Sequence, residues 1–122
     1  MIQFSIDYPP KFGGNYGLNS IYSGKHWYER NKDAEFWHGH VLGTLKKQGI
    51  RRGVYKYPVT ITFYWDDRLD CSNHAYAGKM IEDALKGYLI KDDSRKWVKE
   101  ITHKFHTGKC ILVEIEVKKD GD

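Results

Sequence analysis

The sequence predicts a single α+β domain in which two helices pack on one face of a four-stranded mixed sheet. Four stretches alternate apolar and polar residues with the period of two that is typical of a half-buried strand, and two stretches repeat apolar residues at helical spacing. In chain order they give β-α-β-α-β-β. A chain of 122 residues suffices for one core and is too short for two ordinary domains, so we expect one domain over residues 1–122.

The first strand is expected at residues 2–8, where apolar side chains alternate with Gln3, Ser5 and Asp7. The Pro-Pro pair that follows stops it, because proline cannot donate to a sheet ladder. Four glycines then interrupt every period between residues 11 and 31, which predicts a long loop. Long loops within compact domains tend to be functional or mobile.

The first helix is predicted after this loop, with Asn31 or Asp33 as its N-cap and an end near Gly49. His38 and His40 lie two residues apart and point in different directions on a helix, which disfavours a shared metal ion. The predicted apolar side consists of Ala34, Trp37, Val41 and Leu45. Basic residues crowd its end and the next turn, as solvated surface or as part of a phosphate track: Lys46, Lys47, Arg51, Arg52 and Lys56.

The second strand is expected at residues 59–65 and delivers the chain to a run of acids. The second helix follows, and Asp70, Ser72 or Asn73 can each cap its first turn. Its apolar face is predicted to contain Ala77, Met80, Ile81, Ala84, Leu85 and Tyr88. Two further alternating runs, 97–105 and 111–117, are joined by Thr107-Gly108-Lys109 and predict a β-hairpin.

Composition and charge narrow the class of protein. The chain is 40% hydrophobic and 30% charged, which is typical of a globular domain. It has no apolar run near the roughly 18 residues of a membrane helix and no signal-peptide pattern at its start, so we expect a soluble cytoplasmic protein. Its net charge of +4 favours a polyanionic partner. Cys71 and Cys110 lack zinc-site spacing and are expected to be packing residues.

The residues that could do chemistry concentrate between Trp65 and Asp93. A strand ending in acids runs into a helix that carries Lys79 and Asp83 one turn apart, and an Asp-Asp pair follows the helix. Magnesium prefers a few carboxylates together with waters and phosphate oxygens, and acids at both ends of one element can serve it if the fold brings those ends to a common edge. Alternatively, the acids before the helix are caps and the Lys/Asp pair is a solvated helix pair.

The order Asp70-x-Ser72-Asn73, Lys79, Asp83-Ala84-Leu85 and Asp92-Asp93 resembles the RusA family of Holliday junction resolvases. The family pattern is Asp-x-Asp-Asn, a lysine, Asp-x-Leu and an Asp-Asp pair. The resemblance is close from Trp65 to roughly Val117 and looser before that. It implies a single RusA-like endonuclease domain: a crossover junction endodeoxyribonuclease that cuts four-way DNA in recombination and repair. Members are homodimeric and often encoded by phages or prophages; they require Mg²⁺, for which Mn²⁺ can substitute.

The resemblance also implies roles for single residues. Asp70, Lys79 and Asp93 match catalytic positions, and Asp70 and Asp93, with Asp92 beside them, match metal ligands. Motif positions with a partly structural role are matched by Ser72, Asn73 and Asp83.

One position departs from the family pattern. Ser72 stands where the family has a second acid, so one expected carboxylate is missing. A serine hydroxyl can cap the helix or bind a metal-bound water, but it brings no charge to offset a divalent ion. His74 or Asp92 could compensate, and Asp66 and Asp67 lie close upstream.

Basic and aromatic side chains interleave between Leu18 and Lys32, a composition that suits irregular DNA. A basic segment after the first strand is also thought to meet DNA in the RusA family. Alternatively, Leu18, Ile21, Trp27 and Tyr28 tuck this segment onto the core. The residues expected to bind DNA are Asn19, Lys25, His26, Arg30 and Lys32.

Two rival functions stay open at this point. The first is a catalytically degenerate protein that binds branched DNA without cutting it. The second is a basic accessory domain that binds DNA or a partner protein and uses its acids only as helix caps.

Overall fold

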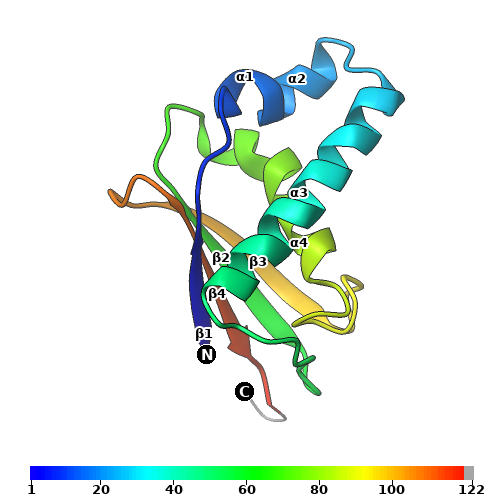
Figure 1. The fold of residues 1–122 in the computed structure, drawn as a ribbon, viewed down its shortest axis with the longest axis vertical. Helices are drawn as coiled ribbons and strands as arrows, with labels where there is room; N and C mark the ends of the chain where they lie inside the picture. Colours follow the sequence, from blue (N-terminus) through cyan, green and yellow to red (C-terminus); the bar gives the residue numbers. More distant parts are fainter. Residues whose placement is uncertain (120–122) are drawn as a thin grey trace.

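The structure of the chain is a computed structural model that describes residues 1–119 (Figure 1). The α+β class and the four-stranded mixed sheet predicted from the sequence are confirmed, and the described part contains four α-helices rather than two. The elements are β1 (Ile2–Ile6), α1 (Phe12–Tyr16), α2 (Leu18–Tyr22), α3 (Trp27–Lys47), β2 (Val59–Trp65), the 3₁₀ helix η1 (Cys71–His74), α4 (Ala75–Leu85), β3 (Val98–Phe105) and β4 (Ile111–Val117). Within residues 1–119, no helix has both the length and the apolar character needed to cross a membrane.

The sheet has the strand order β1-β4-β2-β3, in which β4 is antiparallel to β1 and β2 while β2 and β3 are parallel. Every second residue of β2, from Val59 to Trp65, is buried, and the residues between them are half-exposed. Figure 1 shows α3 and α4 side by side on one face of the sheet. The alternation along β2 therefore reflects one face packed under helices and one face turned to solvent.

The predicted C-terminal hairpin is wrong, because β2 lies between β3 and β4. Residues 106–110 cross the end of β2 instead. The His106 amide donates to the Trp65 carbonyl over 3.0 Å, and the Lys109 amide donates to Asp66 Oδ2 over 2.8 Å. Strands two places apart in a sheet are separated by about 10 Å, which five residues span easily. Alternation predicts that a stretch is a strand, but it does not identify the neighbour.

The long loop predicted between residues 11 and 31 is also wrong, since it holds α1, α2 and the start of α3. Phe12 of α1 is buried, with its ring centroid 5.8 Å from that of Trp65 and 6.2 Å from that of Trp37. The glycines permit close packing here: a Cβ on Gly17 would lie 2.8 Å from the Gly13 carbonyl oxygen. Glycines that break a sequence period can thus serve short, tightly packed helices.

Helix α3 begins at Trp27, earlier than the predicted caps Asn31 and Asp33. His26 is the N-cap, and its Nδ1 accepts from the Tyr28 amide over 3.1 Å. Asp33 instead binds the side chains of Lys25 and Tyr76. Of the predicted apolar side, Ala34 is exposed, and the core residues are Trp37, Val41 and Leu45.

The outer edge of β1 is covered by side chains of α3. Gln48 Nε2, just past the helix, donates to the Ser5 carbonyl over 2.7 Å, and His40 Nε2 lies 2.7 Å from the Asp7 carbonyl. These contacts satisfy acceptors that a sheet edge otherwise leaves free.

Candidate functional site

Helix α4 and the segment after it bring one lysine and three carboxylates together. Lys79 Nζ lies 3.0 Å from Asp83 Oδ1 and 3.5 Å from Glu82 Oε1, and it also pairs with Asp93. Positions three and four residues apart share one face of a helix, which aligns the first three groups. Gly87, with a φ of +78°, helps to turn the chain back after α4 so that Asp93 joins them.

This acid cluster, defined as Glu82, Asp83 and Asp93, could hold a metal ion. One carboxylate oxygen from each residue lies within 4.8 Å of the other two. Carboxylate oxygens are the donors preferred by hard divalent cations such as Mg²⁺, so the donor set fits that class of ion. The exposed fractions of the side chains run from 5% for Glu82 through 22% for Asp93 to 43% for Asp83, so solvent reaches the cluster on one side.

The protonation of the cluster reflects its burial and its lysine. Burial raises the pKa of Glu82, which lies deepest. The hydrogen bond from Lys79 lowers the pKa of Asp93 well below its usual range. Burial alone would lower the pKa of Lys79, but its hydrogen bonds to Asp93 and Asp83 raise it above its ordinary value. The raised pKa keeps Lys79 charged.

A second lysine completes the charge balance. Lys86 Nζ lies 3.5 Å from Asp83 Oδ1 and 3.6 Å from Asp93 Oδ2. Two ammonium groups thus compensate three carboxylates. A divalent ion that entered the cluster would have to shift at least one ammonium away, which links metal binding to a change in lysine contacts.

A hollow of about 360 Å³ opens beside the acid cluster. Glu82 and Asp93 form one side of it, and residues at the start of the edge strand β3 form the other. Arg95 and Lys99 also line it, so the hollow combines metal-type donors with cations that suit a phosphate.

Two of the predicted metal ligands lie outside the acid cluster. Asp70 is exposed at the start of η1, and Asp92 is exposed next to Asp93. From Ala75 to Asp83 alone, α4 rises about 12 Å, so Asp70 and the cluster belong to different ends of the helix. Of the predicted ligands, the cluster contains Asp93, and the assignment of Asp70 and Asp92 stays a prediction.

The residues that match the sequence motif do not all lie in one place either. Asp83 contacts Lys79 as one helical turn dictates. Neither Asp70, Ser72 nor Asn73 caps a helix with its side chain, contrary to the sequence prediction. Instead, Asn73 Oδ1 accepts from the Asn19 amide over 3.0 Å and ties η1 to α2. Sequence analysis missed Glu82, although its spacing of three from Lys79 is the signal that could have identified it.

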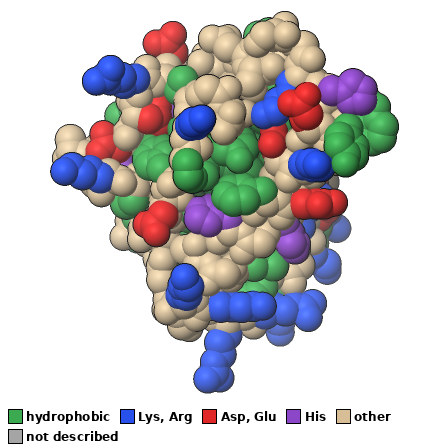
Figure 2. Space-filling model, turned by 45° about the horizontal axis from the view of Figure 1, so that its top comes forward, with side chains coloured by type: hydrophobic (Ala, Val, Ile, Leu, Met, Phe, Trp, Pro, Cys, Tyr) green, Lys and Arg blue, Asp and Glu red, His purple; other side chains and the backbone are tan. Residues whose placement is uncertain are grey.

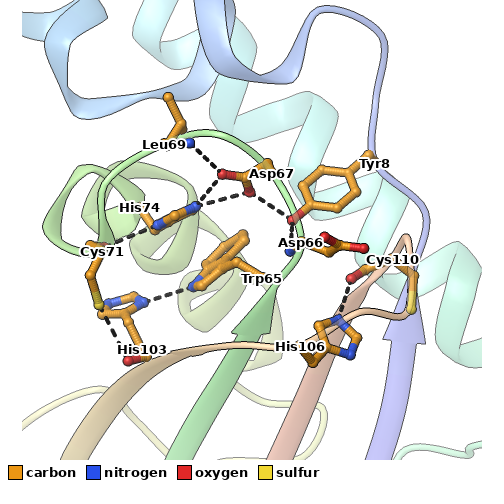
Figure 3. Close-up of polar contacts among 10 residues, drawn as sticks. All are labelled: Tyr8, Trp65, Asp66, Asp67, Leu69, Cys71, His74, His103, His106 and Cys110. Carbon is orange, nitrogen blue, oxygen red and sulfur yellow. Dashed lines mark hydrogen bonds and ion pairs between the residues drawn. The ribbon is translucent and has the colours of Figure 1, made fainter.

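Asp67 and His74, which precede α4, form a separate network with Tyr8, and we call these three residues the buried network (Figure 3). His74 is fully buried, with Nε2 2.8 Å from Asp67 Oδ1 and Nδ1 3.0 Å from the Cys71 carbonyl. Both ring nitrogens thus lie within hydrogen-bond distance of an oxygen acceptor. Tyr8 donates to Asp67 Oδ2 over 2.7 Å, and burial together with this bond raises the pKa of Tyr8.

This network occupies residues that could have replaced the missing acid. Asp67 also accepts from the Leu69 amide, and the His74 ring stacks on Trp65 at 4.4 Å. Asp66 accepts from the Lys109 amide. None of these side chains belongs to the acid cluster. Asp67 and His74 instead hold the loop between β2 and η1 in shape.

The predicted DNA-binding segment divides into structural and free residues. Lys25 lies 2.6 Å from Asp33, donates to the Asn15 carbonyl and has a side chain only 11% exposed, so its charge is already neutralised. His26 caps α3, and the Asn19 amide binds Asn73. Arg30 and Lys32 remain exposed on α3.

The aromatic residues of the same segment do not follow the alternative in which they tuck onto the core. Trp27 is 59% exposed and Tyr28 is 54% exposed. Leu18 and Ile21 are half-buried, but they are not among the residues packed against the core either.

Part of the basic run after α3 is hydrogen-bonded to the turn that follows α4. Arg52 Nε donates to the Gly87 carbonyl over 2.8 Å, and the Gly53 amide donates to the Tyr88 carbonyl over 2.9 Å. Residues 52–55 therefore lie against the turn that follows α4, which starts at Lys86. Figure 2 shows Lys and Arg side chains gathered at the lower end of one face, with the acids of that face higher up.

Comparison of the chain with protein-family models, with curated proteins and with solved structures gives no match in any of the three. The function is therefore inferred from the geometry of the site and from the sequence motif.

Proposed function

We propose that this chain is a magnesium-dependent, structure-specific endonuclease that resolves Holliday junctions in recombination and repair. The observation that carries the proposal is the convergence of Lys79 with Glu82, Asp83 and Asp93 beside a hollow that Arg95 and Lys99 also line. Three oxygen donors suit Mg²⁺ or Mn²⁺, and the surrounding cations suit a phosphodiester. The resemblance to the RusA family supports the same reaction.

In this proposal Glu82, Asp83 and Asp93 hold the metal. A bound ion supplies a water activated for attack and stabilisation of the leaving oxygen. Lys79 has a side chain 53% exposed and sits where an entering cation would weaken its hold on the acids. Its ammonium would then pair with the scissile phosphate and offset its developing charge. Alternatively, Lys79 stays with Asp83 and only keeps the cluster in shape.

The substrate assignment draws on the basic surface around the site. Lys86, Arg95 and Lys99 border the cluster or its hollow, and Arg52 is fixed to Gly87. Such cations bind phosphates regardless of sequence, so the DNA is recognised by its shape and charge. A four-way junction has approximate two-fold symmetry, and two symmetric cuts require two sites, so we propose a C2 homodimer.

A second candidate is a branched-DNA-binding protein without catalysis. Its support is that Asp70 lies outside the acid cluster, that Ser72 brings no charge, and that Lys79 and Lys86 already compensate the acids. In that case the acids and lysines are a surface ion-pair network.

Cleavage of a synthetic four-way junction, compared with a linear duplex of the same arm sequence, separates the candidates. The endonuclease cuts the junction only with Mg²⁺ or Mn²⁺, and sedimentation finds two chains per junction. Junction binding with no cleavage at any metal concentration supports the binding protein. If the chain prefers neither DNA, both proposals fail.

A further inference from the structure

The end of α2 and the start of α3 present three aromatic side chains to solvent. Tyr22 is 78% exposed, Trp27 59% and Tyr28 54%. We define these three residues as the aromatic tip. Other aromatic residues of the same segment pack inward: Phe12 is 6% exposed, and Tyr16 is half-buried against the core. The segment thus sorts its rings into two groups, and the exposed group loses the free energy that burial would supply.

No packing role accounts for the aromatic tip. None of its three rings belongs to the core or to the partly buried residues packed against it. The ring pairs of Trp27 within residues 1–119 are with its sequence neighbours, His26 at 5.7 Å and Tyr28 at 6.3 Å between ring centroids. Contiguous exposed aromatics that do not pack are typical of interaction surfaces.

The charges beside the tip favour a ligand recognised by stacking. Lys32 Nζ stands 4.8 Å from the centre of the Tyr28 ring, and neither Lys32 nor Arg30 forms a salt bridge within residues 1–119. Glu29 and Glu35 on the same helix nearly balance these two cations. Net charge is therefore small here, in contrast to the basic run near Gly87, and the ring faces are the main attraction.

The tip follows the part of the fold that precedes α4, at the end of that helix opposite the acid cluster. The hydrogen bond between the Asn19 amide and Asn73 ties α2 to η1, the element that precedes α4. A DNA strand bound at the acid cluster would therefore have to run along α4 and past η1 and α2 to reach the tip.

We propose that the aromatic tip binds unpaired DNA bases, with Trp27 and Tyr28 as stacking surfaces and Lys32 and Arg30 beside the backbone. Every base has an aromatic face, so such binding tolerates any sequence. Its role at a branch point rests on the proposed function, but binding of single-stranded DNA does not.

The test measures binding of a labelled oligo-dT by fluorescence anisotropy to the full chain. Trp27→Ala and Tyr28→Ala should each weaken binding about fivefold or more, and Trp27→Phe should restore most of it. Tyr57→Ala is the matched control, because Tyr57 is a similarly exposed aromatic (44%) outside the tip and should leave binding unchanged. The fold-loss at Trp27 should persist at high salt, since stacking is not screened. Lys32→Ala should weaken binding mainly at low salt.

Three results overturn the proposal. The first is wild-type affinity for oligo-dT in both alanine variants. The second is a loss that Trp27→Phe does not restore while thermal unfolding is unchanged. The third is conversion of a dimer to a monomer by Trp27→Ala, which would make the tip a subunit contact. Failure of the proposed function looks different: oligo-dT binding depends on Trp27, but no junction is cut.

Discussion

Two arrangements of carboxylates and cations lie at opposite ends of the η1–α4 segment, and they are built differently. In the buried network, Asp67 accepts from Tyr8, Leu69 and His74, and His74 is fully buried. In the acid cluster, Lys79 is shared among three carboxylates and is half-exposed. Complete satisfaction fixes a structure, whereas shared and solvent-accessible partners can be exchanged for a ligand. The contrast indicates that Asp67 and His74 stabilise the fold, whereas the acid cluster is the arrangement that could exchange its partners for a metal ion.

The largest expected effect is a loss of stability when the buried network is disrupted. Asp67→Ala removes the acceptor of His74 Nε2, the Tyr8 hydroxyl and the Leu69 amide. Unfolding free energy should fall by at least about 3 kcal/mol, since each unsatisfied buried donor costs about 1–3 kcal/mol. Urea denaturation measures it. Asp93→Asn is the control and should change stability by less than about 1 kcal/mol. Equal losses of unfolding free energy in both variants would contradict the assignment of a structural role to the buried network alone.

The second prediction tests the exposed side by activity. Asp93→Asn and Glu82→Gln should each lower junction cleavage at least about a hundredfold, because a metal anchor contributes several kcal/mol to the transition state. Junction binding should stay equal or tighten, as repulsion toward phosphates falls. Asp92→Asn is the matched control, exposed and outside the cluster. The measurement is the cleavage rate of a labelled junction. A wild-type rate in Asp93→Asn would show that Asp93 is not a metal ligand.

The two regions should also differ in their response to pH. Burial, and then the nearby His74, lower the pKa of His103, whose Nδ1 accepts from Trp65 Nε1. Its unfolded pKa is about 6.5, so the stability linked to neutral His103 is complete above that pH and is lost as pH falls toward the lowered folded pKa. The lowered pKa of Asp93 contributes stability above about pH 4, lost only in stronger acid. Thermal unfolding of His103→Gln and Asp93→Asn against pH should separate the two windows; a single shared window contradicts this.

The smallest expected effect concerns the position where the RusA pattern is broken. Ser72→Asp should leave the magnesium concentration for half-maximal cleavage unchanged, because Ser72 is exposed on η1 and the acid cluster lies along α4. A magnesium titration of junction cleavage measures it, with Thr107→Asp as an exposed control away from the cluster. A lower requirement in Ser72→Asp alone would place the ion beside Asp70, as the family pattern implies.

Much of the fold follows from periodicity, but strand neighbours do not. Alternation identified all four strands, and helical spacing identified the buried side of α4, because side-chain direction is a local property. The placement of β2 between β3 and β4 depends on which strands bury the most surface together, which no local pattern records. The helices α1 and α2 were missed because Gly13 and Gly17 look like breakers until Phe12 is seen to pack on Trp65.

The site was predicted in part for the same reason. Lys79 and Asp83 are one turn apart, so their contact follows from the helix alone. The addition of Asp93 needed the turn at Gly87. Glu82 lies three residues after Lys79, so their contact also follows from the helix, but its burial depends on the packing of α4 and is not visible in the sequence. Lys25 was predicted to contact DNA, but in the structure its ammonium is paired with Asp33, a contact that the sequence does not indicate.

The covering of the β1 edge by Gln48 and His40 has a consequence for the behaviour of the protein in concentrated solution. Open sheet edges template the growth of further strands and lead to aggregates and amyloid. With the carbonyls of Ser5 and Asp7 already bound, this edge offers a foreign strand fewer places to attach. His40 of α3 and its C-cap residue Gln48 therefore limit the pairing of a second chain along this part of the edge.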